Sequence, residues 1–297
     1  MRVVDAHHHL WAPVSNASGI GYSWLRDIGA PKPFGDPTPI QRDYLIEEFR
    51  AETAHDLVGS VHVQCDGGLP DPVAETAWID AVGETHGMPN AIVAFIDLSR
   101  REARETIERH VAASQHLRGV RHIVARTEGR PDISFAPVEW IEDPTWRANY
   151  AGLAAHGLSF DMQLHPAQMI AAARLIEEHP DVPVVLDHAG SPFERSAKGL
   201  AEWREGMATL AALPHVDCKV SGLGMFEPEW TADSMAPVID GILELFGPDR
   251  TMFGSNFPVD GLFGPYDAII DRIAARVPEA DRASVFEGTA RRAYRIG

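Results

Sequence analysis

Short runs rich in apolar and β-branched residues recur along the chain, and between them lie longer segments whose apolar residues are three and four positions apart. The short runs are typical of buried strands, and the longer spacing is typical of amphipathic helices. The predicted strands are Arg2–Ala6, Leu57–Gln64, Ala91–Asp97, Leu117–Ala125, Leu158–Leu164, Val182–Leu186, His215–Val220 and Thr251–Gly254. The predicted helices are Tyr44–His55, Val73–His86, Arg100–Gln115, Pro144–His156, Pro166–Glu178, Leu200–Leu213, Met235–Phe246 and a terminal helical region, Asp267–Tyr294.

Capping residues support several of these boundaries. Asp71-Pro72 and Asp143-Pro144 each place a side-chain acceptor before a first-turn proline, and Ser99 is expected to cap the helix after the third strand. Glycine is favoured where a helix ends, and it stands at three of the predicted ends: Gly87, Gly157 and Gly247.

Regular alternation of strand and helix predicts parallel strands joined by crossover helices, with both faces of the sheet covered. Eight repeats fit a single α/β domain over residues 1–297, a (β/α)8 TIM barrel. The alternative is a doubly wound open sheet, but no glycine-rich phosphate motif follows the first strand. Two long segments, Trp11–Pro39 and Arg126–Glu142, follow strands, and we expect them to cover the C-terminal face of the barrel as loops.

Composition and charge limit the kinds of molecule that the protein is expected to bind. The 297 residues are 45% hydrophobic, enough for a large core, and the formal charge of −17 opposes binding to nucleic acid or to an anionic membrane surface. No apolar stretch is long enough to span a membrane, and the N-terminal residues, with Asp5 among them, predict no signal peptide. Two distant cysteines, Cys65 and Cys218, are expected to be reduced thiols in the core, so a cytoplasmic protein is expected.

Fourteen histidines are the unusual feature of the composition. His7 and His9, two residues apart at the end of the first strand, should share a face, with His8 on the other. His165 and His188 end the fifth and sixth strands, so a barrel would bring these four imidazoles to one mouth. Neutral imidazoles suit zinc, with Mn, Fe, Co or Ni as alternatives. Five other histidines lie near predicted helix ends, where the helix dipole favours them: His55, His86, His110, His156 and His179.

Five segments give the chain a resemblance to a known family. They read VDAHHHLW, GVRHIV, VLDHAG, CKVSGL and MFGSNFPV and begin at Val4, Gly119, Val185, Cys218 and Met252. Together they resemble the lactonase branch of the metal-dependent amidohydrolase superfamily, of the amidohydrolase 2 type, over nearly the whole chain. The resemblance implies a (β/α)8 hydrolase that opens a sugar-acid or muconate-type lactone with metal-activated water. It also implies one divalent metal held by His7, His9, His165 and His188, although some members of this branch work without metal.

The eighth predicted strand departs from the family's pattern, because Gly254-Ser255-Asn256 stands where the family has Gly-Ser-Asp. Asparagine cannot accept a proton, so the usual base is missing. A metal-acidified water needs little help from a base; otherwise His188, His165 or Asp260 could take the proton. We expect Asn256 to orient water or substrate, and Lys219, at the end of the seventh strand, to stabilise an oxyanion or hold a carboxylate.

Substrate contacts are expected from residues near the mouth. Arg121 and His122 alternate along the fourth strand, and Arg126 begins the loop that follows it. An arginine there could hold a carboxylate through two hydrogen bonds. Trp11 directly follows the histidine motif and is the favoured wall residue, with Tyr22, Trp24 and Phe34 as further candidates, and Asp260 lies near the end of the eighth strand.

The expected substrate is therefore a small molecule, a carboxylated or hydroxylated lactone whose ring size and stereochemistry the sequence does not specify. One alternative is non-oxidative decarboxylation of an aromatic or unsaturated acid, which related barrels perform with similar ligands. Another is a catalytically altered barrel that binds a ligand, suggested by Asn256. The oligomeric state, including a homo-oligomer, is left open.

Overall fold

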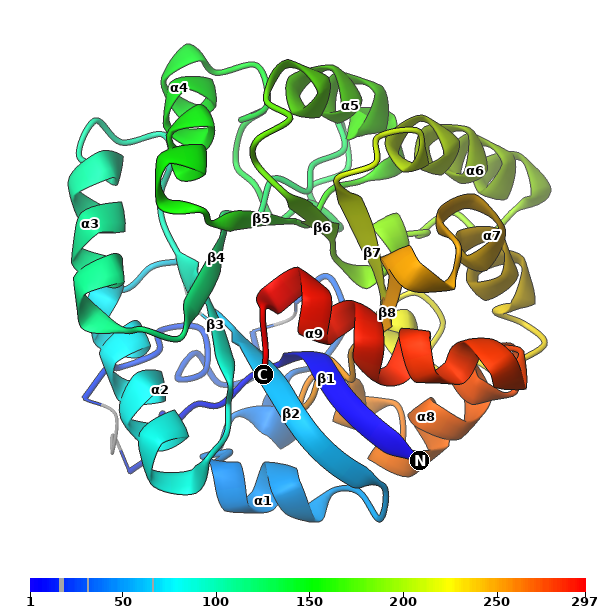
Figure 1. Cartoon of the computed structure of the whole chain (residues 1–297), viewed down its shortest axis with the longest axis horizontal. Helices are drawn as coiled ribbons and strands as arrows, with labels where there is room; N and C mark the ends of the chain where they lie inside the picture. The colour runs from blue at the N-terminus through cyan, green and yellow to red at the C-terminus, as the bar shows by residue number, and fades with distance from the viewer. Residues whose placement is uncertain (16–18, 31, 66) are drawn as a thin grey trace.

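The computed structural model describes residues 1–15, 19–30, 32–65 and 67–297, and its centre is one sheet of eight parallel strands (Figure 1). The strands follow in chain order: β1 (Arg2–His8), β2 (Asp56–Val63), β3 (Ala91–Phe95), β4 (Leu117–Arg121), β5 (Ser159–Met162), β6 (Val184–Leu186), β7 (Val216–Val220) and β8 (Thr251–Phe253). The chain after β8 returns to β1, where Asn256 N–H donates to the His7 carbonyl at 2.7 Å and His9 N–H donates to the Phe257 carbonyl at 2.8 Å. The predicted (β/α)8 barrel is confirmed, and the doubly wound alternative is excluded.

Helices surround this sheet in the predicted alternation (Figure 1). Their bounds are α1 (Ile46–Ala51), α2 (Val73–His86), α3 (Ala103–Ala113), α4 (Pro144–Gly152), α5 (Met169–Glu178), α6 (Ala197–Ala211), α7 (Ala236–Phe246), α8 (Tyr266–Ala274) and α9 (Thr289–Tyr294). Asp143 caps α4 as predicted, because its side chain accepts from Trp146 N–H. The cap predicted at Ser99 is wrong: α3 begins only at Ala103, and the Ser99 hydroxyl and N–H both donate to Asp97.

The C-terminal region is not one helix as predicted. It contains α8, α9 and two single helical turns between them, Glu279–Asp281 and Ser284–Gly288. Pro278 immediately precedes the first turn, and proline lacks the N–H that a continuing helix needs. The break lets α9 turn back over the strands (Figure 1), where Ala290 and Tyr294 are buried against apolar side chains inside the barrel.

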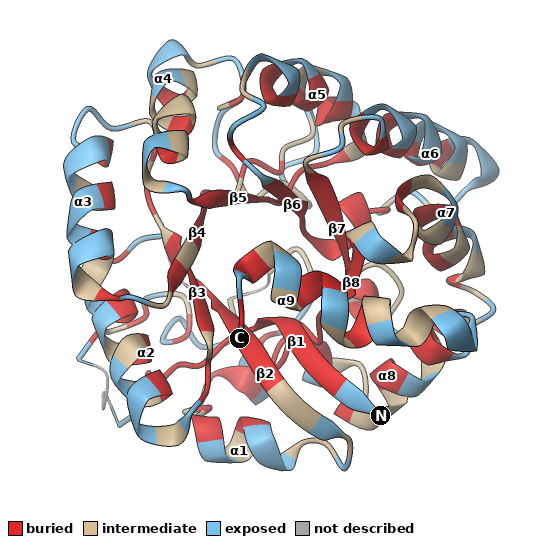
Figure 2. Cartoon of the chain, in the orientation of Figure 1, coloured by how far each residue is buried: buried red, intermediate tan, exposed pale blue. Residues whose placement is uncertain are grey.

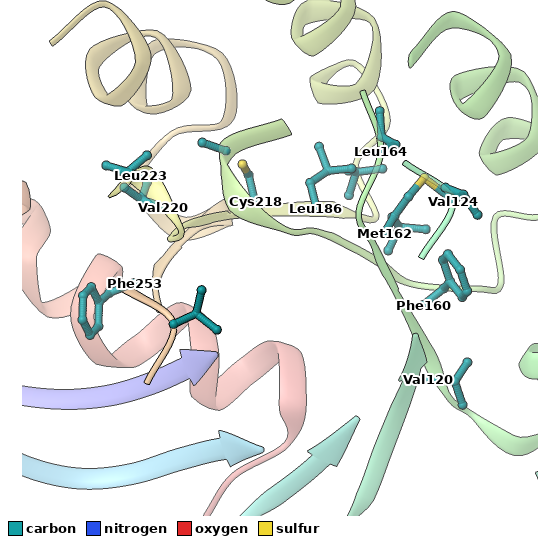
Figure 3. Close-up of a cluster of buried hydrophobic side chains, with 14 of the residues drawn as sticks. Val120, Val124, Phe160, Met162, Leu164, Leu186, Cys218, Val220, Leu223 and Phe253 are labelled. Atoms are coloured by element: carbon teal, nitrogen blue, oxygen red, sulfur yellow. The ribbon is translucent and has the colours of Figure 1, made fainter. Parts of the chain in front are cut away.

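Two apolar layers hold the barrel together. The outer layer lies between the strands and the surrounding helices; in it Phe160 packs against Trp146 and Tyr150 of α4, with ring centroids 5.4 and 5.3 Å apart (Figure 3 shows part of this layer). The inner layer includes Val61 and Val93 and lies inside the barrel. Figure 2 shows the result, with buried strands at the centre and helices whose outer faces are exposed. Side chains that alternate along a strand therefore reach opposite layers.

Within the described ranges, no helix combines the length and apolar character needed to cross a membrane.

Phe160→Ala tests the outer layer. The buried ring contacts two aromatic side chains of α4, so its removal should leave a cavity and lower the free energy of unfolding by about 3–5 kcal/mol. Urea denaturation measures this loss. Ile170→Ala is the control, because Ile170 is half exposed on α5 and its truncation should change stability by about 0.5 kcal/mol or less. Equal losses in the two variants would contradict the described packing.

Candidate active site

A cavity of about 540 Å³ opens where the carboxyl ends of the strands meet the long loops. Among the residues that the structure describes, its lining combines aromatic side chains with polar side chains from the strand ends. The main lining residues are His9, Trp11, Trp24, Lys32, Phe34, Gln64, Cys65, Phe95, Asp97, Arg121, His122, Phe135, Trp140, Gln163, His188, Met225 and Asn256. The two long loops thus cover the site as predicted, although residues 16–18 and 31 of the first lie outside the described ranges. The described lining includes Trp11, Trp24 and Phe34 but not Tyr22.

The histidines of β1 alternate as predicted. His8 turns away from the cavity, with its Nε2 3.0 Å from Ser60 Oγ and its ring stacked on Phe49 at 3.9 Å. His7 and His9 lie on the other side, with ring centroids 5.1 Å apart, and the His188 ring lies 4.5 Å from that of His7. Three imidazoles from β1 and the end of β6 therefore form a cluster.

Hydrogen bonds decide which nitrogens of this cluster carry lone pairs. His9 Nδ1–H donates to the Val63 carbonyl at 2.7 Å, so its lone pair is on Nε2. His7 Nδ1 lies 3.2 Å from Asp187 Oδ1, while its Nε2 lies 3.4 Å from Arg121 Nη1, which can only donate. Lys219 Nζ also lies 3.3 Å from His7 Nδ1, but it already donates to Asp161 and Asp187, so the acceptor Asp187 favours a proton on Nδ1 and a lone pair on Nε2. Burial lowers the pKa of His7 and His9 well below the usual value and that of His188 to about 3, so all three are neutral at pH 7.

This cluster fits a divalent metal by the chemistry of its donors. Ligand atoms of His7, Asp187 and His188 lie within 4.8 Å of one another, and His9 adds a third imidazole at its edge. Histidine ligands usually donate their second nitrogen to a carboxylate or a carbonyl, as His7 and His9 do here. Arg121 Nη1 faces the lone pair of His7 at 3.4 Å, so this guanidinium would have to give way to a metal.

His165 does not join the cluster, contrary to the prediction. Its Nδ1 lies 2.8 Å from Thr127 Oγ1, and its ring packs against Phe193 with a centroid distance of 5.0 Å. The backbone turns at this point, because His165 N–H donates to the Gln168 side chain and Pro166 begins a short helical turn. Gln163, two residues earlier on the same face, lines the cavity instead.

Lys219 lies in a buried network of charges rather than at the cavity, so its geometry gives no support to the predicted oxyanion role. Its Nζ is 2.5 Å from Asp161 Oδ2 and 3.0 Å from Asp187 Oδ1, and the described lining of the cavity does not include it. Tyr294, from α9, donates its hydroxyl to Asp161 Oδ2 at 2.6 Å. The ammonium group therefore neutralises carboxylates of the protein rather than a group of the substrate.

The two carboxylates of this network differ in acidity. Burial would raise the pKa of Asp187, but Lys219, His7 and Arg121 together hold it well below the usual range. Burial raises the pKa of Asp161 to about 6 in spite of Lys219. Asp187 was not among the candidates from sequence, although the Asp187-His188 pair at the end of β6 was a visible signal.

The predicted substrate contacts separate into two groups. Arg121 and His122 both line the cavity, and Arg121 Nε–H has no hydrogen-bond partner in the described part of the chain. His122 Nδ1 accepts from Leu98 N–H and Trp146 Nε1–H, so its own proton is on Nε2. Arg126, in contrast, donates to the Pro137 carbonyl at 2.8 Å and is not part of the described lining, so it holds the loop rather than a substrate.

Asn256 and Asp260 form a pair at the edge of the cavity. Asn256 lines it, and its Nδ2–H donates to Asp260 Oδ1 at 2.8 Å. Asp260 lies behind Asn256, outside the described lining, so the predicted direct contact with substrate is not supported. Burial raises the pKa of Asp260 to about 7.

Several lining residues were missed by sequence reasoning. Gln64 and Gln163 directly follow β2 and β5, and Asp97 follows β3 after one residue, positions that predict a place at the mouth of a barrel. Their side chains are common on any surface, so the position alone was a weak signal. Trp140 lies deep in a loop of irregular sequence, and no local pattern indicates it.

A second group of metal-ligating side chains, His62, Cys65 and Glu75, lies beside the cavity. His62 Nδ1 accepts from Leu10 N–H, so its proton is on Nε2, 3.6 Å from Glu75 Oε1. That tautomer opposes metal binding at Nε2 and makes the group a hydrogen-bonded support for the end of β2. Cys65 is half-buried and lines the cavity, so it is not the core thiol that was expected.

Comparisons with known proteins agree with this fold and site. A family model described as amidohydrolase matches residues 4–296. An L-fucono-1,5-lactonase from Burkholderia multivorans is 30% identical over 309 residues, covering 99% of this chain and 96% of that protein. The uncharacterized protein y4mH from Sinorhizobium fredii is 36% identical over 299 residues, covering 99% of this chain and 98% of that one. A crystal structure of a Burkholderia multivorans amidohydrolase with bound zinc matches with a TM-score of 0.79 and 28% identity over 100% of both chains. The chain belongs to the amidohydrolase family.

Lys219→Met tests the charge network. The substitution leaves Asp161 and Asp187 buried without their cation, so it should lower the free energy of unfolding at pH 7 by about 3–5 kcal/mol. Loss of the cation raises the pKa of both carboxyls above the unfolded value of about 3.9, so the folded variant binds protons that the unfolded chain releases. Its stability should therefore fall as pH rises from about 4 through neutrality, measured by urea denaturation across that range. Lys198→Met, at an exposed lysine of α6, should match the native protein at every pH, and a loss in Lys219→Met that is the same at every pH would contradict the network.

Proposed function

We propose that this protein is a lactonase that hydrolyses a sugar-acid or muconate-type lactone in the cavity at the carboxyl ends of the strands. One observation carries the proposal: neutral His9 and His188 line the same cavity as the hydrogen-bond donors of Arg121 and His122. This combination can hold an activated water beside a polarised carbonyl. The 30% identity to an L-fucono-1,5-lactonase supports a cyclic ester as the substrate class.

The proposal includes one divalent metal, zinc first, held by the imidazoles of His7, His9 and His188. When bound, such a metal polarises a carbonyl oxygen and lowers the pKa of a coordinated water to about 7. The zinc-bound amidohydrolase structure supports zinc over the alternatives Mn, Fe, Co and Ni. Asp187 and the Val63 carbonyl would hold the rings of His7 and His9 in place.

The acidity of the site's bases explains why a metal is part of the proposal. Of the candidate bases, His188 lines the cavity, and its pKa of about 3 makes it a weak acceptor. A group this weakly basic cannot take a proton from ordinary water, whose pKa is far higher. As a metal ligand His188 would also have its lone pair engaged, so the proposal gives His188 the role of a ligand and not of the base.

The other cavity residues bind and orient the substrate. His122 Nε2–H can donate to a lactone oxygen, and Asn256 can hydrogen-bond to the attacking water. Trp11 and Trp140 provide flat apolar surfaces for a ring, and each carries a buried indole N–H without a partner among the described residues.

His9→Ala and His165→Ala distinguish the proposed metal set from the one expected from sequence. His9→Ala should abolish metal retention and activity, because it removes an imidazole that lines the cavity. His165→Ala should retain stoichiometric metal, because His165 faces Thr127 and Phe193 instead. Metal analysis of protein purified without a histidine tag measures both. Loss of metal in His165→Ala, or full metal content in His9→Ala, would contradict the assignment.

A panel of sugar-acid and muconate-type lactones tests the reaction itself. Ring opening releases a carboxylic acid, so turnover should acidify a weakly buffered solution, followed with a pH indicator. Evolution of carbon dioxide from aromatic or unsaturated acids would favour the decarboxylase instead. Tight ligand retention with no turnover on any substrate would favour the ligand-binding barrel.

A further inference from the structure

Asn256 occupies the position at the end of β8 where the family has its carboxylate, and its backbone is held firmly. Its N–H donates to the His7 carbonyl at 2.7 Å, and its carbonyl accepts from Asp260 N–H at 3.1 Å. The residue has a φ of 56°, a left-handed conformation that asparagine adopts more readily than most residues. These backbone hydrogen bonds fix the position of Asn256 at the cavity wall. Its amide group could still be oriented in either of two ways.

Asp260 decides that orientation. This carboxyl is 1% exposed; its Oδ1 accepts from Asn256 Nδ2 at 2.8 Å and its Oδ2 accepts from Gly224 N–H at 3.3 Å. Both oxygens of Asp260 accept here, one from Asn256 Nδ2–H and the other from Gly224 N–H, so the ionised carboxyl holds the amide nitrogen of Asn256 toward it. The same nitrogen also lies 3.7 Å from Met225 Sδ, so partners on the protein face the Nδ2 end of the amide. The Oδ1 atom has no hydrogen-bond partner among the described residues, and Asn256 lines the cavity.

We propose that Asp260 is a positioning residue that locks the Asn256 amide with its oxygen toward the cavity, where it accepts a hydrogen bond from the O–H of water or substrate. This inference rests on the proposed lactonase function. Without the lock, the amide could rotate and present two N–H donors, which would repel an O–H donor at the same place. Asn256 thus supplies a hydrogen-bond acceptor where the family has a carboxylate. The negative charge is on Asp260, behind the cavity wall.

A purely structural role for Asp260 is the competing explanation, because the carboxylate also binds Gly224 N–H and supports the turn after β7. The two roles make different predictions for an exchange of the pair. The double variant Asn256→Asp/Asp260→Asn conserves total charge and keeps one amide–carboxylate hydrogen bond. If Asp260 positions Asn256, the double variant should recover activity, because it again places an acceptor at the cavity wall. If Asp260 is only structural, the double variant should stay impaired, because the carboxylate beside Gly224 is still missing.

The experiment compares both single variants with the double variant on a lactone substrate. Asp260→Asn removes the lock, because an amide partner permits either orientation, and kcat should fall about tenfold with little change in KM. Asn256→Asp places two carboxyls within hydrogen-bond distance, where they cannot both ionise, and should also lose about tenfold. The double variant should recover to within about threefold of the native protein and gain a new loss of activity at acid pH. Asp271→Asn, at an exposed position of α8, controls for the change in net charge and should be unaltered.

A second measurement does not need catalysis. The locked side-chain NH₂ of Asn256 should give a pair of resonances with slow hydrogen exchange in nitrogen–proton NMR spectra, assigned by their absence in Asn256→Asp. Asp260→Asn should abolish this protection while thermal unfolding shows that the variant is folded. If the Asn256 amide is protected in the native protein and unprotected in Asp260→Asn but no lactone is hydrolysed, the positioning role of Asp260 is supported and the proposed function is not.

Three results would overturn the inference. The first is unchanged protection of the Asn256 amide in folded Asp260→Asn. The second is a kcat for Asp260→Asn within about twofold of the native value on an accepted lactone. The third is a double variant no more active than the worse single variant, which would assign Asp260 the structural role.

Discussion

The buried ammonium group of Lys219 is the charge on which the rest of the site depends. It lies inside the barrel between Asp161 and Asp187, and each of these carboxylates connects it to a different part of the molecule. Asp161 binds the hydroxyl of Tyr294, so the C-terminal helix α9 is tied to the network from one end of the barrel. Asp187 contacts His7 and Arg121, so the same network orients the groups below the cavity. An ion left unpaired in such an interior costs several kcal/mol, which is why these groups occur together.

Above this network the site changes from charged to neutral groups. Burial keeps His9 and His188 uncharged, and a carbonyl or hydroxyl fixes the remaining nitrogen of each ring. Neutral imidazoles can act as ligands or as weak acceptors, whereas imidazolium groups could do neither. Aromatic side chains of the two long loops line the same cavity as these neutral imidazoles. The site therefore has a buried charged layer and a neutral layer at the cavity.

Asn256 shows how a departure from a family pattern is accommodated. Replacing a carboxylate by an amide removes a base and also removes one charge from a site that already contains Arg121 and Lys219. Asp260 supplies a carboxylate four residues later, close enough to hydrogen-bond to the amide but behind the cavity wall. The proposed lock would leave an acceptor without basicity at the cavity wall.

The sequence by itself determined the barrel, because alternation of short β-branched runs with amphipathic segments leaves few ways to bury both faces of a parallel sheet. It also determined that His7, His9 and His188 meet, since strand ends converge at one mouth whatever their separation in the chain. Local signals could not show that Pro166 turns the chain and takes His165 out of the cluster, or that Pro278 breaks the terminal helix so that Tyr294 reaches Asp161. Nor could they assign Lys219, Arg126 and Asp260, whose partners lie far away in sequence or behind a neighbouring side chain. Only tertiary structure decided these roles, because the environment of a charged group depends on the partners and the burial that packing gives it, and the periodicity of one segment carries no information about either.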